Sequence, residues 1–79
     1  MKLAFIRDRI IKQKLIDILG HKMAEDICNE ARFASISAKE EKEQLEIFVE
    51  KTCSDPRFIG MWGTSQALKQ KSEWLGLLT

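Results

Sequence analysis

Hydrophobic residues in the segment 2–19 recur at the spacing of an α-helix, and Gly20 follows where a C-terminal helix glycine belongs. At about 100° per residue, these hydrophobic positions fall on more than one side of the predicted helix. One stripe holds Ala4, Ile11, Leu15, Ile18 and Leu19, a second holds Leu3, Ile6 and Ile10, and a third side holds Phe5 and Ile16. A surface helix needs a single apolar stripe, so this helix carries more apolar surface than it can bury alone.

A second helical pattern covers residues 22–34 and places mostly small side chains on one face. That face holds Met23, Ala24, Ile27, Cys28, Ala31 and Ala34. Because small side chains let a neighbouring helix approach closely, we expect this helix to be central and tightly packed. Phe33 points away from the small-residue face.

A third helix is predicted over residues 38–52 by a capping-box pattern, in which Ser37 is followed by Glu40 three positions later. The serine hydroxyl can accept a hydrogen bond from a free backbone N–H at the helix start, and the carboxylate can reach back to the cap residue. The expected core face of this helix is Leu45, Phe48, Val49 and Thr52. Ile47 lies on the opposite side of the helix.

Two shorter signals complete the chain. Asp55 suits the N-cap position and Pro56 the first position of a short helix that ends by Trp62. Thr64 or Ser65 is then expected to cap a last helix over residues 66–75. Its stripe is Ala67, Leu68, Lys71, Trp74, Leu75 and Leu78. The sequence therefore predicts one all-α domain over residues 1–79, with four to five helices in orthogonal or bundle-like packing.

Charge is balanced overall but unevenly distributed. The 79 residues include 13 Lys plus Arg and 12 Asp plus Glu, which argues against a nucleic-acid binder that relies on bulk positive charge. Residues 1–22 are basic, residues 23–50 acidic and residues 51–79 basic, with net charges of +4, −5 and +2. Two interpretations fit this order. Opposite charges can meet within one chain, or the basic helix of one subunit can meet an acidic face of another.

The cysteines and the hydropathy pattern bear on the compartment. Cys28 and Cys53 stand apart from any C-x-x-C pattern, beside apolar residues, so we expect two reduced, half-buried thiols. No apolar run is long enough for a transmembrane helix or a signal peptide. We therefore expect a cytoplasmic protein that does not enter a membrane.

Residues for catalysis, metal binding or phosphate binding are sparse. His21, the only histidine, suits the end of the first helix and has no nucleophile motif to act on. Cys28, Cys53 and His21 lack the paired spacing of zinc ligands, and the surroundings of Gly60 and Gly63 lack the strand and lysine of a phosphate loop. We expect no enzyme activity, no metal and no cofactor.

A helix-turn-helix DNA-binding protein is one alternative function. The segment 56–62 would form the first helix and precede a recognition helix that contacts DNA through Thr64, Ser65, Gln66, Lys69 and Gln70. Lys71 on the apolar stripe weakens this interpretation. A small-molecule sensor with a pocket near Trp62 and Trp74 is a second alternative, supported only by these aromatic residues.

Protein association has the strongest support, because apolar residues exceed what one small bundle can cover. The predicted interface residues are Leu3, Ile6, Ile10, Phe33, Ile47, Phe58, Met61 and Trp62. The competing explanation is that these residues fill the core of crossing helices. The leading hypothesis is a non-catalytic interaction module, a homodimeric regulator or adaptor in which Leu3, Ile6 and Ile10 anchor self-association.

Overall fold

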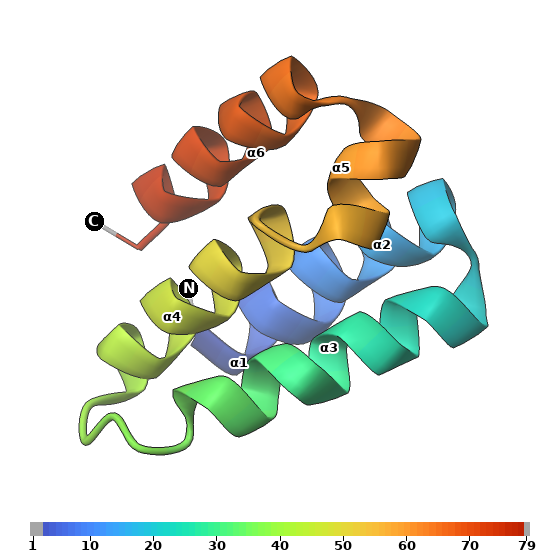
Figure 1. Cartoon of the computed structure of the whole chain (residues 1–79). Coiled ribbons are helices and arrows are strands. Elements are labelled where there is room, and N and C mark those ends of the chain that lie inside the picture. Colours follow the sequence, from blue (N-terminus) through green and yellow to red (C-terminus); the bar gives the residue numbers. More distant parts are fainter. Residues whose placement is uncertain (1–2, 79) are drawn as a thin grey trace.

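The computed structural model describes residues 3–78 and confirms the all-α prediction, since every regular element in that range is a helix. The first helix (residues 3–19) is continuous and consists of α1 (Leu3–Phe5), a π-helical segment η1 (Ile6–Ile11) and α2 (Lys12–Leu19). The remaining helices are α3 (His21–Ser35), α4 (Glu41–Cys53), α5 (Pro56–Trp62) and α6 (Thr64–Gly76). Successive long helices run in opposite directions, and the short α5 turns the chain between α4 and α6 (Figure 1).

The π-helical segment explains the two apolar stripes of the first helix. In an α-helix, Ile6 and Ile11 would lie about 140° apart around the axis. In a π-helix the hydrogen bonds join residues five apart, so these two side chains lie one turn apart on the same side. Ile6 and Ile11 are 1% and 0% exposed, and Leu15 continues the buried row four residues later. The wider turn therefore merges residues from the two predicted stripes into one buried face.

Two glycines make the sharpest reversals. Gly20 joins α2 to α3, and Gly63 joins α5 to α6, each as a single linking residue. Their φ angles are 87° and 95°, in a region that side-chain-bearing residues rarely adopt. The expected end of the first helix at Gly20 is confirmed.

α4 occupies the middle of the bundle. It packs against α3 most extensively and also contacts α6, α5 and α1, and it lies between α3 and α6 in Figure 1. Its predicted core face is buried as expected: Leu45, Phe48, Val49 and Thr52. The predicted tight packing of residues 22–34 through small side chains is confirmed, since Ala24, Cys28 and Ala31 are buried. The predicted central position is wrong, because α3 packs mainly against α2 and α4, whereas α4 contacts α3, α6, α5 and α1.

One of the three predicted N-terminal caps forms. The Asp55 carboxylate accepts a hydrogen bond from the backbone N–H of Arg57 (2.9 Å), with Pro56 at the first helical position, as predicted. The predicted capping box is wrong, because Ser37 lies in the turn after α3 and α4 begins only after Glu40. The predicted cap by Thr64 or Ser65 is also wrong. Gly63 itself turns the chain, so Thr64 is already the first residue of α6.

Candidate functional site

The predicted interface residues separate into core and surface. Ile6 and Phe58 are 1% and 0% exposed, so the prediction that they lie at an interface, Ile6 as an anchor, is wrong. The π-helical segment turns Ile6 inward, and the Phe58 ring packs against Trp62 and Trp74, with ring centroids 5.3 and 6.4 Å away. Leu3, Ile10, Ile47 and Trp62 are half-buried. Phe33 and Met61 are the exposed members of the predicted set, at 79% and 63%.

A groove opens at the end of the bundle where α1, the C-terminal turn of α3 and the first turns of α4 meet. Its volume is about 240 Å³. The buried side chains of Leu45 and Phe48 and the half-buried Leu3 line its interior, and Ala4 and Ile36 are exposed at its rim. The groove is therefore mostly apolar and open to solvent.

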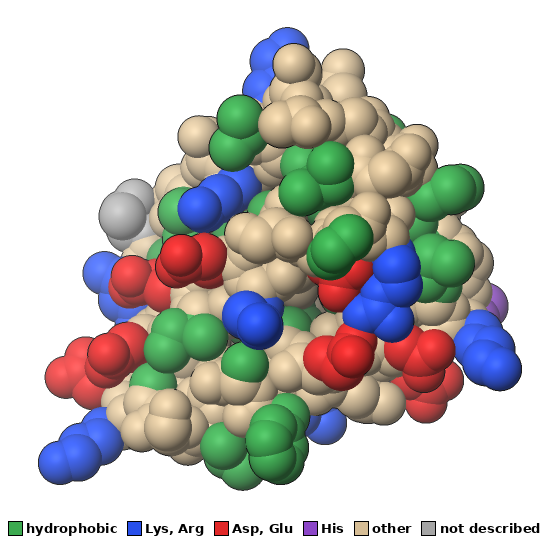
Figure 2. All heavy atoms as spheres, in the orientation of Figure 1, with side chains coloured by type: hydrophobic (Ala, Val, Ile, Leu, Met, Phe, Trp, Pro, Cys, Tyr) green, Lys and Arg blue, Asp and Glu red, His purple; other side chains and the backbone are tan. Residues whose placement is uncertain are grey.

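Two large apolar side chains protrude beside the groove. Phe33 and Ile36 are 79% and 71% exposed and lie three residues apart at the end of α3. Figure 2 shows hydrophobic side chains in several separate groups on one face of the molecule, with charged side chains between them, and one group lies at the lower edge over α3. We call Arg32, Phe33, Ile36 and the groove the Phe33 face. The sequence pattern predicts that Phe33 lies off the core stripe. It gives no such signal for Ile36, which directly precedes the predicted cap at Ser37.

The rim of the groove carries charges of both signs. Arg7 Nε donates to Asp8 Oδ1 (3.0 Å), and this hydrogen bond lowers the pKa of Asp8 and raises the pKa of Arg7. Arg32 and Glu41 also line the groove. Within the described part of the chain, neither Arg32 nor Glu41 forms a side-chain hydrogen bond or an ion pair. The charge of Glu41 adds to the raised pKa of Arg7, and the charge of Arg32 adds to the lowered pKa of Asp8, so each charge already faces an opposite charge on the rim.

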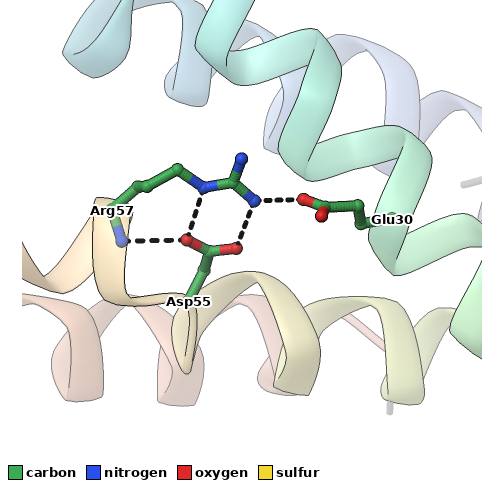
Figure 3. A network of polar contacts seen from close by, with 3 residues as sticks. All are labelled: Glu30, Asp55 and Arg57. Atoms are coloured by element: carbon green, nitrogen blue, oxygen red, sulfur yellow. Dashed lines mark hydrogen bonds and ion pairs between the residues drawn. The ribbon is translucent and has the colours of Figure 1, made fainter.

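A second polar cluster joins α3 to the start of α5 (Figure 3). Arg57 donates from Nε and from its terminal nitrogen to the two carboxylate oxygens of Asp55, at 2.9 and 2.8 Å, and also pairs with Glu30 of α3. The hydrogen bonds from Arg57 hold the pKa of Asp55 below its usual range. The Asp55 carboxylate accepts from both the backbone N–H and the guanidinium of Arg57, so Arg57 connects the start of α5 to Glu30 of α3.

Two further cavities border this cluster. One of about 170 Å³ lies between α3 and the α4–α5 turn, and one of about 500 Å³ lies by the α2–α3 turn, beside Arg57. The second is lined by the half-buried Leu19 and Met23 and by charged side chains, among them Lys22 and Asp26. Neither cavity has a large exposed apolar side chain among its lining residues, as the groove has in Ile36.

Four of the five residues of the helix-turn-helix alternative are exposed, and the fifth is buried. Thr64, Ser65, Gln66 and Lys69 are exposed on α6, whereas Gln70 is buried and donates to Glu73 (3.2 Å). A helix-turn-helix joins its helices by a turn of about three or four residues. α5 and α6 are joined by Gly63 alone. No structural observation favours the DNA-binding alternative.

The aromatic residues of the sensor alternative belong to the core. Trp74 is 2% exposed and stacks on Phe58, and Trp62 lies half-buried beneath the ammonium group of Lys14, which is 5.4 Å from the ring centroid. The three cavities described above are lined by other residues. These rings anchor α5 and α6 to the bundle.

The thiols of Cys28 and Cys53 are free and buried. Burial raises the pKa of both thiols, that of Cys53 to about 12, which keeps them protonated and unreactive. Within residues 3–78, no three His, Cys, Asp or Glu side chains gather in a way that could hold a metal ion. Every helix in the described range is too short or too polar to span a lipid bilayer.

Comparison with known proteins adds no relative. No family model, no curated protein and no solved structure matches this chain. Its function is therefore inferred from the Phe33 face and the groove.

Proposed function

We propose that this protein is a non-catalytic interaction module that self-associates through the Phe33 face and acts as a regulator or adaptor in the cytoplasm. The observation that carries the proposal is the pair of exposed side chains, Phe33 and Ile36, beside an apolar groove of about 240 Å³. Contiguous exposed apolar surface of this kind typically marks a binding site on a small domain. Large aromatic side chains next to a pocket are also typical of the residues that dominate binding energy.

This proposal moves the interface from the first helix to the end of α3. Ile6, one of the three predicted anchors, lies in the core, and Leu3 and Ile10 are half-buried against it. A partner cannot reach Ile6 while the first helix keeps its π-helical turn. In this proposal, Phe33 and Ile36 form the exposed apolar surface for association, in place of the first helix.

The first test is the mass of the protein in solution, measured by light scattering over a concentration series. We expect the wild type to shift from monomer to dimer as concentration rises, and Phe33→Ser to stay monomeric over the same range. Met61→Ser is the matched control, because Met61 is also exposed and apolar but lies on α5, at the opposite end of the bundle (Figure 1). A wild type that remains monomeric up to its solubility limit would refute the proposal.

A further inference from the structure

We infer that the occupant of the groove is Phe33 of a second copy, and that two copies exchange these side chains reciprocally about a two-fold axis near Ile36. This inference rests on the proposed self-association and adds to it the identity of the docked group. It follows from three features of the Phe33 face: the size of the groove, the arrangement of residues on α3 and the distribution of charge.

The groove has room for an aromatic ring. A closed apolar cavity of about 150 Å³ is enough to hold benzene. The groove measures about 240 Å³ and is lined inside by Leu3, Leu45 and Phe48. A phenylalanine ring therefore fits, with space for the Cβ that carries it, and would replace water on both apolar surfaces.

The arrangement on α3 makes the surface self-complementary. Ile36 follows Arg32 by four residues and Phe33 by three, so these two side chains lie on opposite flanks of Ile36. Arg32 and Ile36 line the groove, whereas Phe33 projects on the other flank. A two-fold contact matches each surface point with its rotated equivalent. With the axis near Ile36, the protruding ring of each copy faces the groove of the other.

The charges favour a second copy over a partner of single sign. The groove is lined by the exposed side chains of Arg32 and Glu41, and in the part of the chain that the structure describes neither forms a hydrogen bond or ion pair with its own chain. An acidic partner would place like charge against Glu41, and a basic partner would place like charge against Arg32. A second copy brings both signs and can pair each of them.

The test uses two variants that disable opposite halves of the exchange. Phe33→Ser removes the protruding ring and leaves the groove open. Ala4→Trp fills the groove from its rim, where Ala4 is exposed, and leaves Phe33 intact. Gln13→Trp is the control for added aromatic surface, because Gln13 is exposed on the same helix and does not line the groove. Far-UV circular dichroism establishes that each variant is folded.

We expect Phe33→Ser and Ala4→Trp each to be monomeric at concentrations where the wild type and Gln13→Trp are dimers. An equal mixture of the first two should form a heterodimer, because one intact ring then meets one intact groove. Native mass spectrometry identifies that species. Each lost ring–groove pair should raise the dissociation constant at least about tenfold, so the heterodimer should be weaker than the wild-type dimer.

Two results would overturn the inference while leaving self-association in place. One is an Ala4→Trp variant that dimerises as tightly as the wild type, which would mean that the groove is empty in the dimer. The other is a folded mixture that forms no heterodimer, which would mean that the exchange is not reciprocal. A monomeric wild type is a separate outcome that refutes the proposed function itself.

Discussion

Gly63 and Gly60 provide a sharp test of how the chain turns between α5 and α6. Both glycines lie near the end of α5, and a Cβ added at either position would meet no atom within 4 Å. They differ in backbone conformation. Gly63 has φ 95° and ψ 149°, whereas Gly60 lies within the helix Pro56–Trp62. Substitution by alanine therefore changes backbone energy at both sites with no steric contact to complicate the comparison.

The expected effects have opposite signs. A side-chain-bearing residue in the conformation of Gly63 costs about 1–3 kcal/mol, so Gly63→Ala should lower the free energy of unfolding by that amount. Alanine is preferred over glycine in a helix interior, so Gly60→Ala should raise it by about 0.5–1 kcal/mol. For a domain of this size, 1 kcal/mol corresponds to roughly 4–8 °C in Tm. Gly63→Ala should therefore melt about 5–20 °C below the wild type.

The measurement is thermal and urea unfolding, followed by far-UV circular dichroism and by the fluorescence of Trp62 and Trp74. Gly20→Ala is a second test of the same reasoning, since Gly20 has φ 87° and also has open space around its Cβ position. If Gly63→Ala were as stable as the wild type, or if Gly60→Ala lost as much stability as Gly63→Ala, the argument from backbone conformation would be refuted.

Three further predictions follow from buried or paired groups. Asp55→Asn should keep the N-cap but lose the ion pair with Arg57. Because the folded pKa of Asp55 is lowered, the ionised carboxylate stabilises the fold above about pH 4, and this stabilisation is lost as pH falls through the folded pKa. The urea midpoint of Asp55→Asn should therefore decline less with acid than that of the wild type. Asp55→Ala should lose about 1 kcal/mol more. Thr52→Val should raise the free energy of unfolding by about 1 kcal/mol, since the buried Thr52 hydroxyl has no hydrogen-bond partner among the described residues; a lower urea midpoint would contradict this. Cys28 and Cys53 should resist thiol reagents at about pH 8 until urea unfolds the chain, and rapid labelling of the native protein would show that the thiols are accessible.

The parts of the fold that depend on local chemistry could be predicted from the sequence. The core face of α4 follows from the spacing of Leu45, Phe48, Val49 and Thr52, because three- and four-residue steps place side chains on one side of a helix. The start of α5 follows from Asp55-Pro56, since the cap and the proline each act on adjacent backbone. These signals need no knowledge of the neighbouring helices.

Predictions of helix starts were wrong where a neighbouring segment decided the outcome. Ser37 has the right residue three positions later, but α3 extends to Ser35 and the following turn places Ser37 outside the next helix. α4 therefore begins after Glu40. The backbone of Glu40 is extended, and the pattern of Ser37 and Glu40 does not predict that conformation. Likewise, Gly63 turned the chain before Thr64 or Ser65 could act as a cap.

The π-helical segment decides which apolar side chains of the first helix are buried, and so it bears on which apolar surface remains exposed at the Phe33 face. An assumed α-helical period left Ile6 and Ile10 on a separate stripe, and that surplus pointed to the first helix as the interface. One wider turn places Ile6 in the core beside Ile11, so the first helix no longer supplies an exposed anchor. Phe33 and Ile36 have no such route inward, because α3 already faces α2 and α4 with its small residues. The exposure of these two side chains to water is therefore unfavourable in the monomer, and contact with a second copy would bury them.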